Sequence, residues 1–367
     1  MTESANPPVE SKKRQYPCPG CGASLEYSPE AKELLCPYCG RKELVAQGEA
    51  EVQELSYLDY LRSDRIPIAK VGQKQVRCNG CGATTASNDL ARSCPFCSSA
   101  LVVEVAQEES IPPGAVLPFK IPRSTALDDF RKWIQGLWFA PNQLKKLAAH
   151  EGIRGIYVPH WTFDTETRTF YTGERGEHYW VEEAYTETVN GKTEMKTRRV
   201  MHTRWYPASG TVERFFDDVL VPAVQKTFSP KELSPLEPWD LDSAEPYEPS
   251  FLAGFEALRY EVDLEPGFEV AKVTMDSTIL SDCRRAIGGD EQRVHSKKTQ
   301  FSAITFKHLL LPVWMAAYRF RERTWRVRIN ARTGEIHGER PYSAAKITAL
   351  VLVIVAVVVA IVILANR

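Results

Sequence analysis

The chain has 367 residues, 25% of them charged, and a formal net charge of -1. This length allows two or three packed units, and the near-neutral charge excludes a protein that is basic over its whole surface, as many nucleic-acid binders are. The charge is uneven, because Lys and Arg outnumber Asp and Glu by nine to three in residues 301–346. That basic stretch precedes an apolar segment, where anionic lipid would attract it.

The N-terminus is polar and has no apolar run, so no signal peptide is expected and the cysteines should stay in the reducing cytosol. The fold class that we expect is α+β: two tandem four-cysteine zinc ribbons, an αβ body with mainly antiparallel strands, and one C-terminal transmembrane helix. The expected units are a disordered leader at 1–15, zinc ribbon 1 at 16–45, a helical linker at 46–75, zinc ribbon 2 at 76–106, a linker at 107–114, the αβ body at 115–342 and a transmembrane helix at 346–365.

Eight of the nine cysteines form four Cys-x-x-Cys pairs before residue 100. Zinc prefers four soft ligands in a tetrahedron, and a Cys-x-x-Cys turn directs two sulfurs to one point. Within each unit, the second pair follows the first after 14 or 12 residues, which suits a short two- or three-stranded ribbon. The sequence therefore predicts two zinc ions, held by Cys18, Cys21, Cys36 and Cys39 and by Cys78, Cys81, Cys94 and Cys97.

A glycine follows the second cysteine of three pairs, at Gly22, Gly40 and Gly82, where the backbone can need a positive φ and an amide that faces sulfur. A disulfide framework and thioredoxin-like redox pairs are the alternatives to zinc. Because protein ligands fill all four positions on each zinc, the predicted role is structural. Zinc ribbons serve protein docking, nucleic-acid binding or folding alone, and the slightly acidic balance of residues 1–110 favours protein docking.

The αβ body should begin with a helix near Thr125, which Pro141 divides in two. Residues 155–221 have a strand-like composition, with Asn190-Gly191 as a hairpin turn. Residues 229–250 are rich in proline and predict an irregular excursion. A long amphipathic helix is expected at 268–287, and strands return at 306–340. Pro-x-Trp occurs within 158–173 and again within 311–325, so a duplicated strand module and a chance recurrence are both open.

Residues 347–365 are nineteen in number, with Thr348 the only polar one. At 1.5 Å per residue a helix of this length spans about 28 Å, close to the thickness of the hydrocarbon core. The basic residues lie on its N-terminal side, so the positive-inside rule places the bulk of the chain in the cytoplasm. We expect a tail-anchored, single-pass protein of the cytoplasmic (inner) membrane. The recurrence of Arg319, Arg321 and Arg323 predicts one basic strand face, either solvated or lying on anionic lipid.

No catalytic constellation is recognisable. Asn190-Gly191-Lys192-Thr193 resembles the end of a phosphate-binding loop, but Thr186 stands where that motif needs glycine, so a hairpin turn is predicted. The seven histidines form no metal-binding pair, Cys283 is expected to be a packed side chain, and Asp217-Asp218 to serve a turn or cap. The expectation is a protein that is not an enzyme, with no catalytic residue and no cofactor besides zinc.

Several segments together resemble a known family. They are LPFKIPRSTALDDFRKWI, GIYVPHWTFD, FDDVLVPA, GGDEQRV, LLLPVWMAAYRF and TGEIHGERPYSAAKI, which follow the tandem ribbons. From Tyr16 to its end, the chain resembles a family of bacterial zinc-ribbon membrane proteins, often labelled TFIIB-type zinc ribbon or primosomal helicase-like. The resemblance implies protein partners of the flotillin-like or phage-shock type, in envelope-stress or membrane-organising complexes.

The function expected from all of this is a non-enzymatic, membrane-anchored scaffold or docking protein. The protein would contact lipid through the C-terminal helix and through the basic strands of its body. The alternative is a membrane-tethered nucleic-acid-binding factor. Helicase activity is not expected, because the nucleotide-binding loop is missing, and neither is nucleic acid as the main partner.

Overall fold

The computed structural model describes residues 13–14, 16–45, 52–62, 74–77, 84–87, 91–93, 100–103, 111–141, 143–144, 153–189, 192–225, 228, 230–320 and 323–365. The four cysteines of the second predicted ribbon lie outside this part of the chain.

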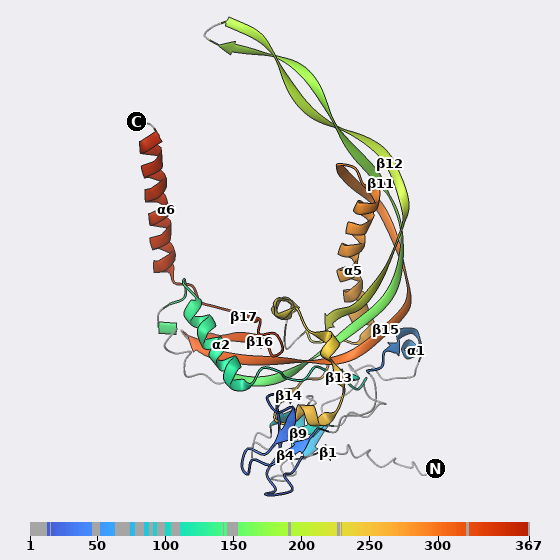
Figure 1. The fold of residues 1–367 in the computed structure, drawn as a ribbon, viewed down its shortest axis with the longest axis vertical. Helices are drawn as coiled ribbons and strands as arrows, with labels where there is room; N and C mark the ends of the chain where they lie inside the picture. Colours follow the sequence, from blue (N-terminus) through green and yellow to red (C-terminus); the bar gives the residue numbers. More distant parts are fainter. Residues whose placement is uncertain are drawn as a thin grey trace, which may run out of the picture.

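The body is built on one curved, mainly antiparallel sheet (Figure 1). Its central path runs β1-β9-β8-β14-β11-β15-β10-β13, with β12 on β11, β16 and β5 on β15, and β17 on β16. The α+β class with mainly antiparallel strands is thereby confirmed. The strands of this sheet are β1 Lys13–Arg14, β5 Leu55–Ser56, β8 Ala91–Ser93, β9 Ala100–Val103, β10 Ala115–Val116, β11 Ile153–Val189, β12 Lys192–Pro222, β13 Glu245–Pro246, β14 Glu256–Ala257, β15 Glu291–Phe320, β16 Arg323–Asn330 and β17 Ile336–Gly338.

Two smaller sheets lie at the N-terminal side, β2-β3-β4 and β6-β7. Their strands are β2 Glu26–Ser28, β3 Glu33–Leu35, β4 Lys42–Leu44, β6 Lys74–Arg77 and β7 Thr84–Ser87. The described helices are α1 Tyr57–Leu61, α2 Arg123–Gly136, α4 Pro230–Leu233, α5 Leu264–Ile287 and α6 Ala344–Ala365, with 3-10 turns η3 Ser234–Leu236, η4 Leu241–Ser243 and η5 Pro249–Leu252. Short turns of this kind make up the irregular excursion predicted at 229–250.

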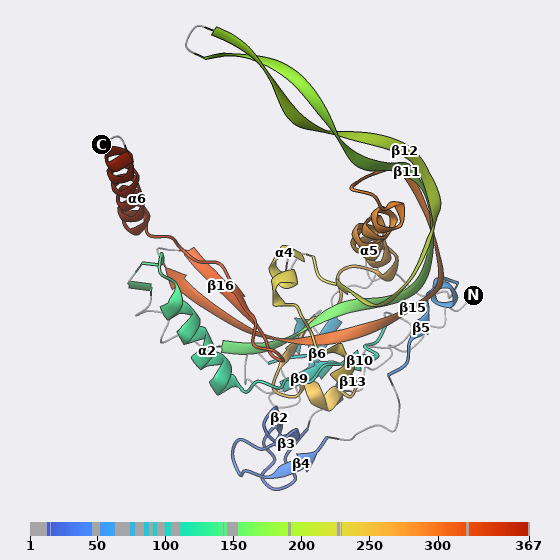
Figure 2. The ribbon, with the colours of Figure 1, turned by 45° about the horizontal axis from the view of Figure 1, so that its top comes forward.

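The longest strands, β11 and β12, extend beyond the rest of the sheet (Figures 1 and 2). Pairing of β11 with β15 stops at Gly176, whereas pairing with β12 continues until Val189 lies opposite Lys192. We call residues 177–189 and 192–204 the arm. Only two residues, 190 and 191, connect its strands, which confirms the hairpin predicted there; their own conformation lies outside the described chain.

The sheet bends where three strands lose their regular register. Asp164 of β11 lies at a bulge in both of its pairings. Opposite it, Asp218 and Ala303 have positive φ angles of 48° and 49°. Extra residues at a bulge increase bending and twist, so the arm leaves the base of the sheet at an angle (Figure 2). The pair Asp217-Asp218 thus lies at a bulge inside β12, and not at the turn or cap that was predicted for it.

The centre of the sheet contains the same arrangement twice. A short strand, a helix and a hairpin follow one another as β10, α2, β11 and β12, and again as β14, α5, β15 and β16. The indole of Trp161 donates to the carbonyl of Val262, just before α5, at 2.9 Å. The indole of Trp314 donates to the carbonyl of Ile121, just before α2, at 2.8 Å. Each tryptophan therefore fixes the start of the helix from the other half.

Backbone hydrogen bonds repeat in the same way. The Ala223 amide donates to the Pro159 carbonyl at 3.0 Å, and the Ala331 amide donates to the Pro312 carbonyl at 3.1 Å. The apolar residues that begin the two Pro-x-Trp motifs lie opposite each other where β11 and β15 pair. A duplicated strand module would make these contacts about an approximate two-fold axis; the duplication itself stays a prediction.

The two main helices supply the apolar core on one side of the sheet. Phe130 and Ile134 of α2 are buried against the side of the sheet that carries Trp314, and Phe268 of α5 packs 5.2 Å from the Phe163 ring. Cys283 of α5 is fully buried, as predicted for a packed side chain, and this burial raises the pKa of its thiol. The long helix predicted at 268–287 is confirmed, and α5 begins one turn earlier.

Two expectations for the later strands need correction. Strands were expected from residue 306, but β15 begins at Glu291, because its polar first half gains regular pairing from β11. Arg319 and Arg323 were expected on one face of one strand. Instead Phe320 pairs with Arg323 as β15 turns into β16, so the two arginines belong to opposite strands of a hairpin. Arg321 lies outside the described residues.

The chain leaves the body through α6, a helix of 22 residues with a mean hydropathy of 3.5 over its most apolar window. None of that window is buried against the rest of the protein. By length and composition α6 could cross a membrane, and a helix so apolar on all sides is not stable facing water.

Candidate metal centre

The first two cysteine pairs lie in matching backbone turns. The Gly22 amide donates to the Cys18 carbonyl at 2.8 Å, and the Gly40 amide donates to the Cys36 carbonyl at 3.0 Å. Both glycines have positive φ angles, 76° and 72°, which is the region where a side chain would cause strain. The positive φ predicted for these two glycines is confirmed, but their amides face carbonyl oxygens and not sulfur. Gly82 lies outside the described residues.

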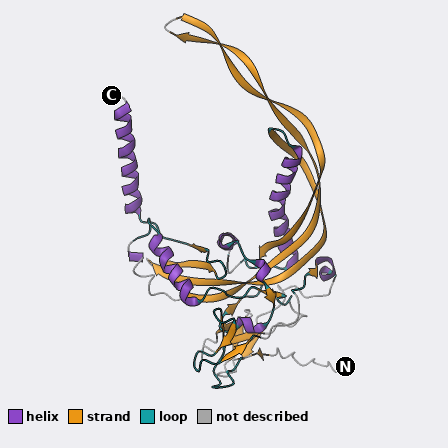
Figure 3. Ribbon diagram, viewed as in Figure 1, coloured by secondary structure: helices purple, strands orange, loops and turns teal. Residues whose placement is uncertain are grey.

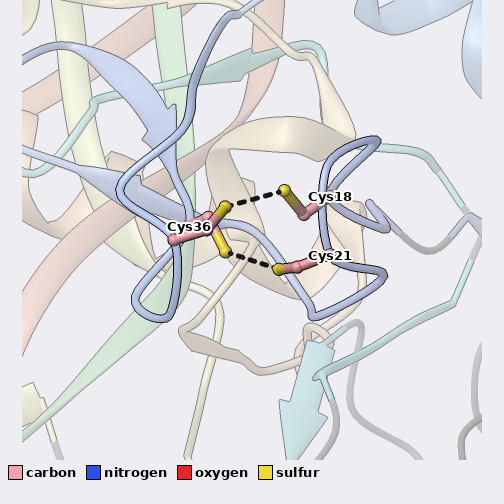
Figure 4. A group of neighbouring side chains, drawn as sticks. Cys18, Cys21 and Cys36 are labelled. Atoms are coloured by element: carbon pink, nitrogen blue, oxygen red, sulfur yellow. Dashed lines mark hydrogen bonds between the residues drawn. The ribbon is translucent and has the colours of Figure 1, made fainter.

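Strands β2, β3 and β4 form a small antiparallel sheet that brings the two turns together. The sulfurs of Cys18 and Cys39 are 3.4 Å apart, and those of Cys21 and Cys36 are 3.5 Å apart (Figure 4). All four sulfurs lie within 4.8 Å of one another. Because Zn–S bonds are about 2.3 Å long, sulfurs at the corners of a zinc tetrahedron lie about 3.8 Å apart, so this cluster fits the ion closely.

The four thiols differ in acidity. The Cys39 amide, which approaches the Cys36 sulfur, lowers the pKa of that thiol to about 6. Burial raises the pKa of Cys18, but two backbone amides outweigh burial and lower it overall. The Ala23 amide lowers the pKa of Cys21, but the neighbouring sulfurs raise it by more, so that the resulting pKa is about 12. Four thiolates would repel one another, and a divalent cation removes that repulsion. The cluster can therefore hold a metal ion through four protein ligands, with no coordination position left for a substrate.

This ribbon is attached to the body. The Tyr27 amide of β2 donates to the Ala253 carbonyl at 2.9 Å, and the Tyr27 ring meets Phe251 edge-on at 5.3 Å. Tyr27 and the neighbouring Leu25 and Leu34 are buried. A metal ion that orders the ribbon therefore also orders one surface of the body.

The second set of ligands, Cys78, Cys81, Cys94 and Cys97, lies outside the described residues, but the strands on either side of it are described. Arg77 pairs with Thr84 around the third Cys-x-x-Cys, and Ser93 pairs with Ala100 around the fourth. In the first ribbon, Leu35 and Lys42 pair in the same positions around Cys36 and Cys39.

A cluster of charged groups that sequence reasoning did not find lies at the bend of the sheet. Lys307 bridges Glu54 at 3.2 Å and Asp218 at 2.7 Å. Thr305 donates to Glu54 at 2.7 Å, and the Asp218 amide donates to Asp164 at 2.6 Å. Burial, followed by the nearby Glu54 carboxylate, raises the pKa of Asp164 to about 7. The cluster fixes the segment between the ribbons to the sheet.

No local pattern pointed to this cluster, because its members come from four distant parts of the chain. Pairing of the short strand β5 with β15 brings Glu54 next to Lys307. The only signal available in the sequence was the Asp217-Asp218 pair. We assign these groups to packing and attachment, since every charge has a partner within the cluster.

Comparison with known proteins gives one distant relative to report. The chain is 25% identical over 336 residues to the uncharacterized protein YdjG of Bacillus subtilis (strain 168), which covers 91% of this chain and 92% of that protein. No family model matches the chain, and no solved structure matches it.

Proposed function

We propose that this protein is a non-enzymatic scaffold that is anchored in the cytoplasmic membrane by α6 and faces the cytoplasm. The observation that carries this proposal is the four-cysteine cluster, which is closed by protein sulfurs and seated on a body that ends in an exposed apolar helix. A metal without an open position stabilises a surface and does not activate a substrate. The basic residues on the N-terminal side of α6 support the cytoplasmic orientation of the body.

We also propose a second zinc ion, held by Cys78, Cys81, Cys94 and Cys97. In both ribbons the residue just before a Cys-x-x-Cys pair forms a strand pair with the residue three positions after the second cysteine. This common frame supports two similar sites, the first of which has its sulfurs in place.

Metal content tests both sites. The purified full-length protein should contain two zinc ions per chain, measured by atomic emission under reducing conditions. Cys36→Ser should lower the content to about one, because loss of one ligand releases one ion and unfolds that ribbon. Cys283→Ser is the matched control and should retain two ions. A content of one zinc ion in the parent protein would contradict the second zinc site, and a content of zero would contradict both sites.

The partner that we propose is a protein docked on the ribbons, of the flotillin-like or phage-shock type that the resemblance implies. The test is co-purification of a purified candidate with the full-length protein from solubilised membranes. Binding to the parent that is lost in Cys36→Ser and retained in Cys283→Ser supports docking on the first ribbon. Binding of DNA with a strong dependence on salt would favour the alternative, a membrane-tethered nucleic-acid-binding factor.

A further inference from the structure

The start of α6 is fastened to the loop that follows α2. The Ser343 amide donates to the Phe139 carbonyl at 2.7 Å. The Lys346 ammonium donates to the carbonyls of Trp138 and Ala140 at 3.0 and 2.9 Å. Three hydrogen bonds therefore hold the loop at the level where the chain turns into the apolar helix.

Aromatic and basic side chains gather at this level. Trp138 is 78% exposed and Tyr342 is 57% exposed, although both are large and apolar. The Arg340 guanidinium lies 5.6 Å from the centre of the Tyr342 ring. Trp and Tyr with Lys and Arg are the residues that proteins place at the boundary between lipid and water, because each has an apolar part and a polar end.

A hollow of about 570 Å³ lies beside these residues. Trp133 of α2, Trp325 of β16 and Ile336 of β17 form its apolar wall. His337, Glu339, Arg340 and Tyr342 supply polar groups, so a carboxylate lies in the lining beside the guanidinium. Its lining reaches Tyr342, two residues before α6 begins. A cavity with aromatic walls and a guanidinium at its rim has the chemistry to hold a phosphate headgroup above an acyl chain.

We propose that the residues around the start of α6 form a membrane-surface site that binds phospholipid headgroups. We call this site the collar; it consists of Trp133, Trp138, Trp325, Arg340, Tyr342 and Lys346. The inference rests on the proposed insertion of α6, and adds that the body itself contacts the lipid. Phospholipid is the occupant because the collar is continuous with α6, and none of the described residues of α6 is buried. Trp138 then lies among the headgroups and the upper part of the acyl chains.

Quenching of tryptophan fluorescence by brominated lipid tests the collar. The chain has eight tryptophans and none lies in α6, so any quenching by lipid reports contact of the body with the membrane. The full-length protein is reconstituted in vesicles of phosphatidylcholine and phosphatidylglycerol, with bromine placed either near the glycerol end or near the methyl end of the chains. We expect stronger quenching by the first lipid. Trp138→Phe should clearly reduce that quenching, because Trp138 is exposed whereas Trp133 and Trp325 are partly buried.

Trp180→Phe is the matched control, because Trp180 is also exposed, at 63%, but lies on the arm. It should leave the quenching unchanged. Unchanged quenching in Trp138→Phe, or no quenching of protein that floats with the vesicles, overturns the collar while α6 still anchors the chain. Protein that fails to float with vesicles overturns the anchoring itself, so the two failures are distinguishable.

Discussion

Two long extensions, α6 and the arm, leave the body toward the same side (Figures 1 and 3). The first is apolar on every face, with a mean hydropathy of 3.5 in its most apolar window. The second carries acidic residues on β11 and basic residues on β12, paired across the strands as Glu182 with Arg199 and Glu187 with Lys196. Charged groups in hydrocarbon cost several kcal/mol, on the order of 3 each. Only α6 can therefore enter a bilayer.

The contrast shows that a protruding shape does not determine what an element binds. A helix satisfies its own backbone groups and can lie in lipid, whereas a two-stranded arm has two open edges that need water or another strand. Both extensions leave the body on the same side. The arm must therefore point away from the bilayer that surrounds α6 when the protein is inserted. The hydrogen bonds at Ser343 and Lys346 fasten the first turn of α6 to the loop that follows α2.

The largest expected effect separates the two extensions by deletion. Removal of 344–367 should move the protein completely into the soluble fraction, because α6 supplies the apolar surface that holds it in the membrane. Removal of the arm, by joining residue 176 to residue 205 through a short Asn-Gly turn, should leave the protein in the membrane fraction. Fractionation with immunoblotting measures both, and a soluble arm deletion would show that the arm contributes to anchoring.

A single charge should distinguish them almost as clearly. Val355→Asp places a carboxylate near the middle of α6 and should cost about 3 kcal/mol of insertion. Val181→Asp makes the same change on the arm, where the side chain is partly exposed, and should cost less than about 1 kcal/mol of stability. Membrane association for the first and thermal unfolding for the second provide the comparison. Equal membrane association of Val355→Asp and the parent would contradict the role of α6.

The body that joins the extensions should respond to acid. Burial lowers the pKa of both His160 and His308 to about 4, and the Trp161 ring packs 4.9 Å from His308. The unfolded chain binds these protons first, near its ordinary pKa of about 6.5. Stability is therefore fully present above about pH 6.5 and is lost as the pH falls toward 4, by up to about 3 kcal/mol for each histidine.

The measurement is denaturant unfolding of the full-length protein in detergent, followed by tryptophan fluorescence between pH 7 and pH 4.5. His308→Gln should lower the slope of stability against pH, whereas His295→Gln, at an exposed site, should not. Loss of any bound metal in acid affects all three proteins equally and cancels in the comparison. Equal slopes in the parent and His308→Gln would show that His308 is protonated in the folded state.

Sequence reasoning reached the features that local chemistry determines. The spacing of Cys18, Cys21, Cys36 and Cys39 was enough to predict one cluster, because each turn closes within five residues. Asn190-Gly191 likewise defined the tip of the arm, and α6 was evident from its composition. The sites at Glu54 and His308 could not be found in this way, since each depends on strands that are far apart in the sequence.

The same limit explains the error over the arginines. Spacing of two predicts one strand face only if the strand continues, and nothing local to Arg319 and Arg323 signalled the turn between them. The extent of β15 was missed for a related reason. Its first half is polar, so no apolar alternation marks it as a strand, and pairing with β11 is what orders it.

The smallest expected effect concerns the charged pairs of the arm. Glu183 contacts Arg198 at 3.4 Å and His202 at 3.3 Å, and all three side chains are well exposed. Glu183→Gln should lower the free energy of unfolding only slightly, by less than about 1 kcal/mol, because exposed ion pairs are screened. A clearly larger loss would mean that the arm's charges hold a partner or a second copy of the chain.

The orientation of the chain about α6 tests the central claim most directly. Protease is added to the outside of intact cells that produce the full-length protein, and the same treatment is repeated after the cells are broken. If the ribbons and the body lie in the cytoplasm and α6 crosses the membrane, the protein stays uncut until the cells are broken. Cleavage within the ribbons or the arm in intact cells would contradict it.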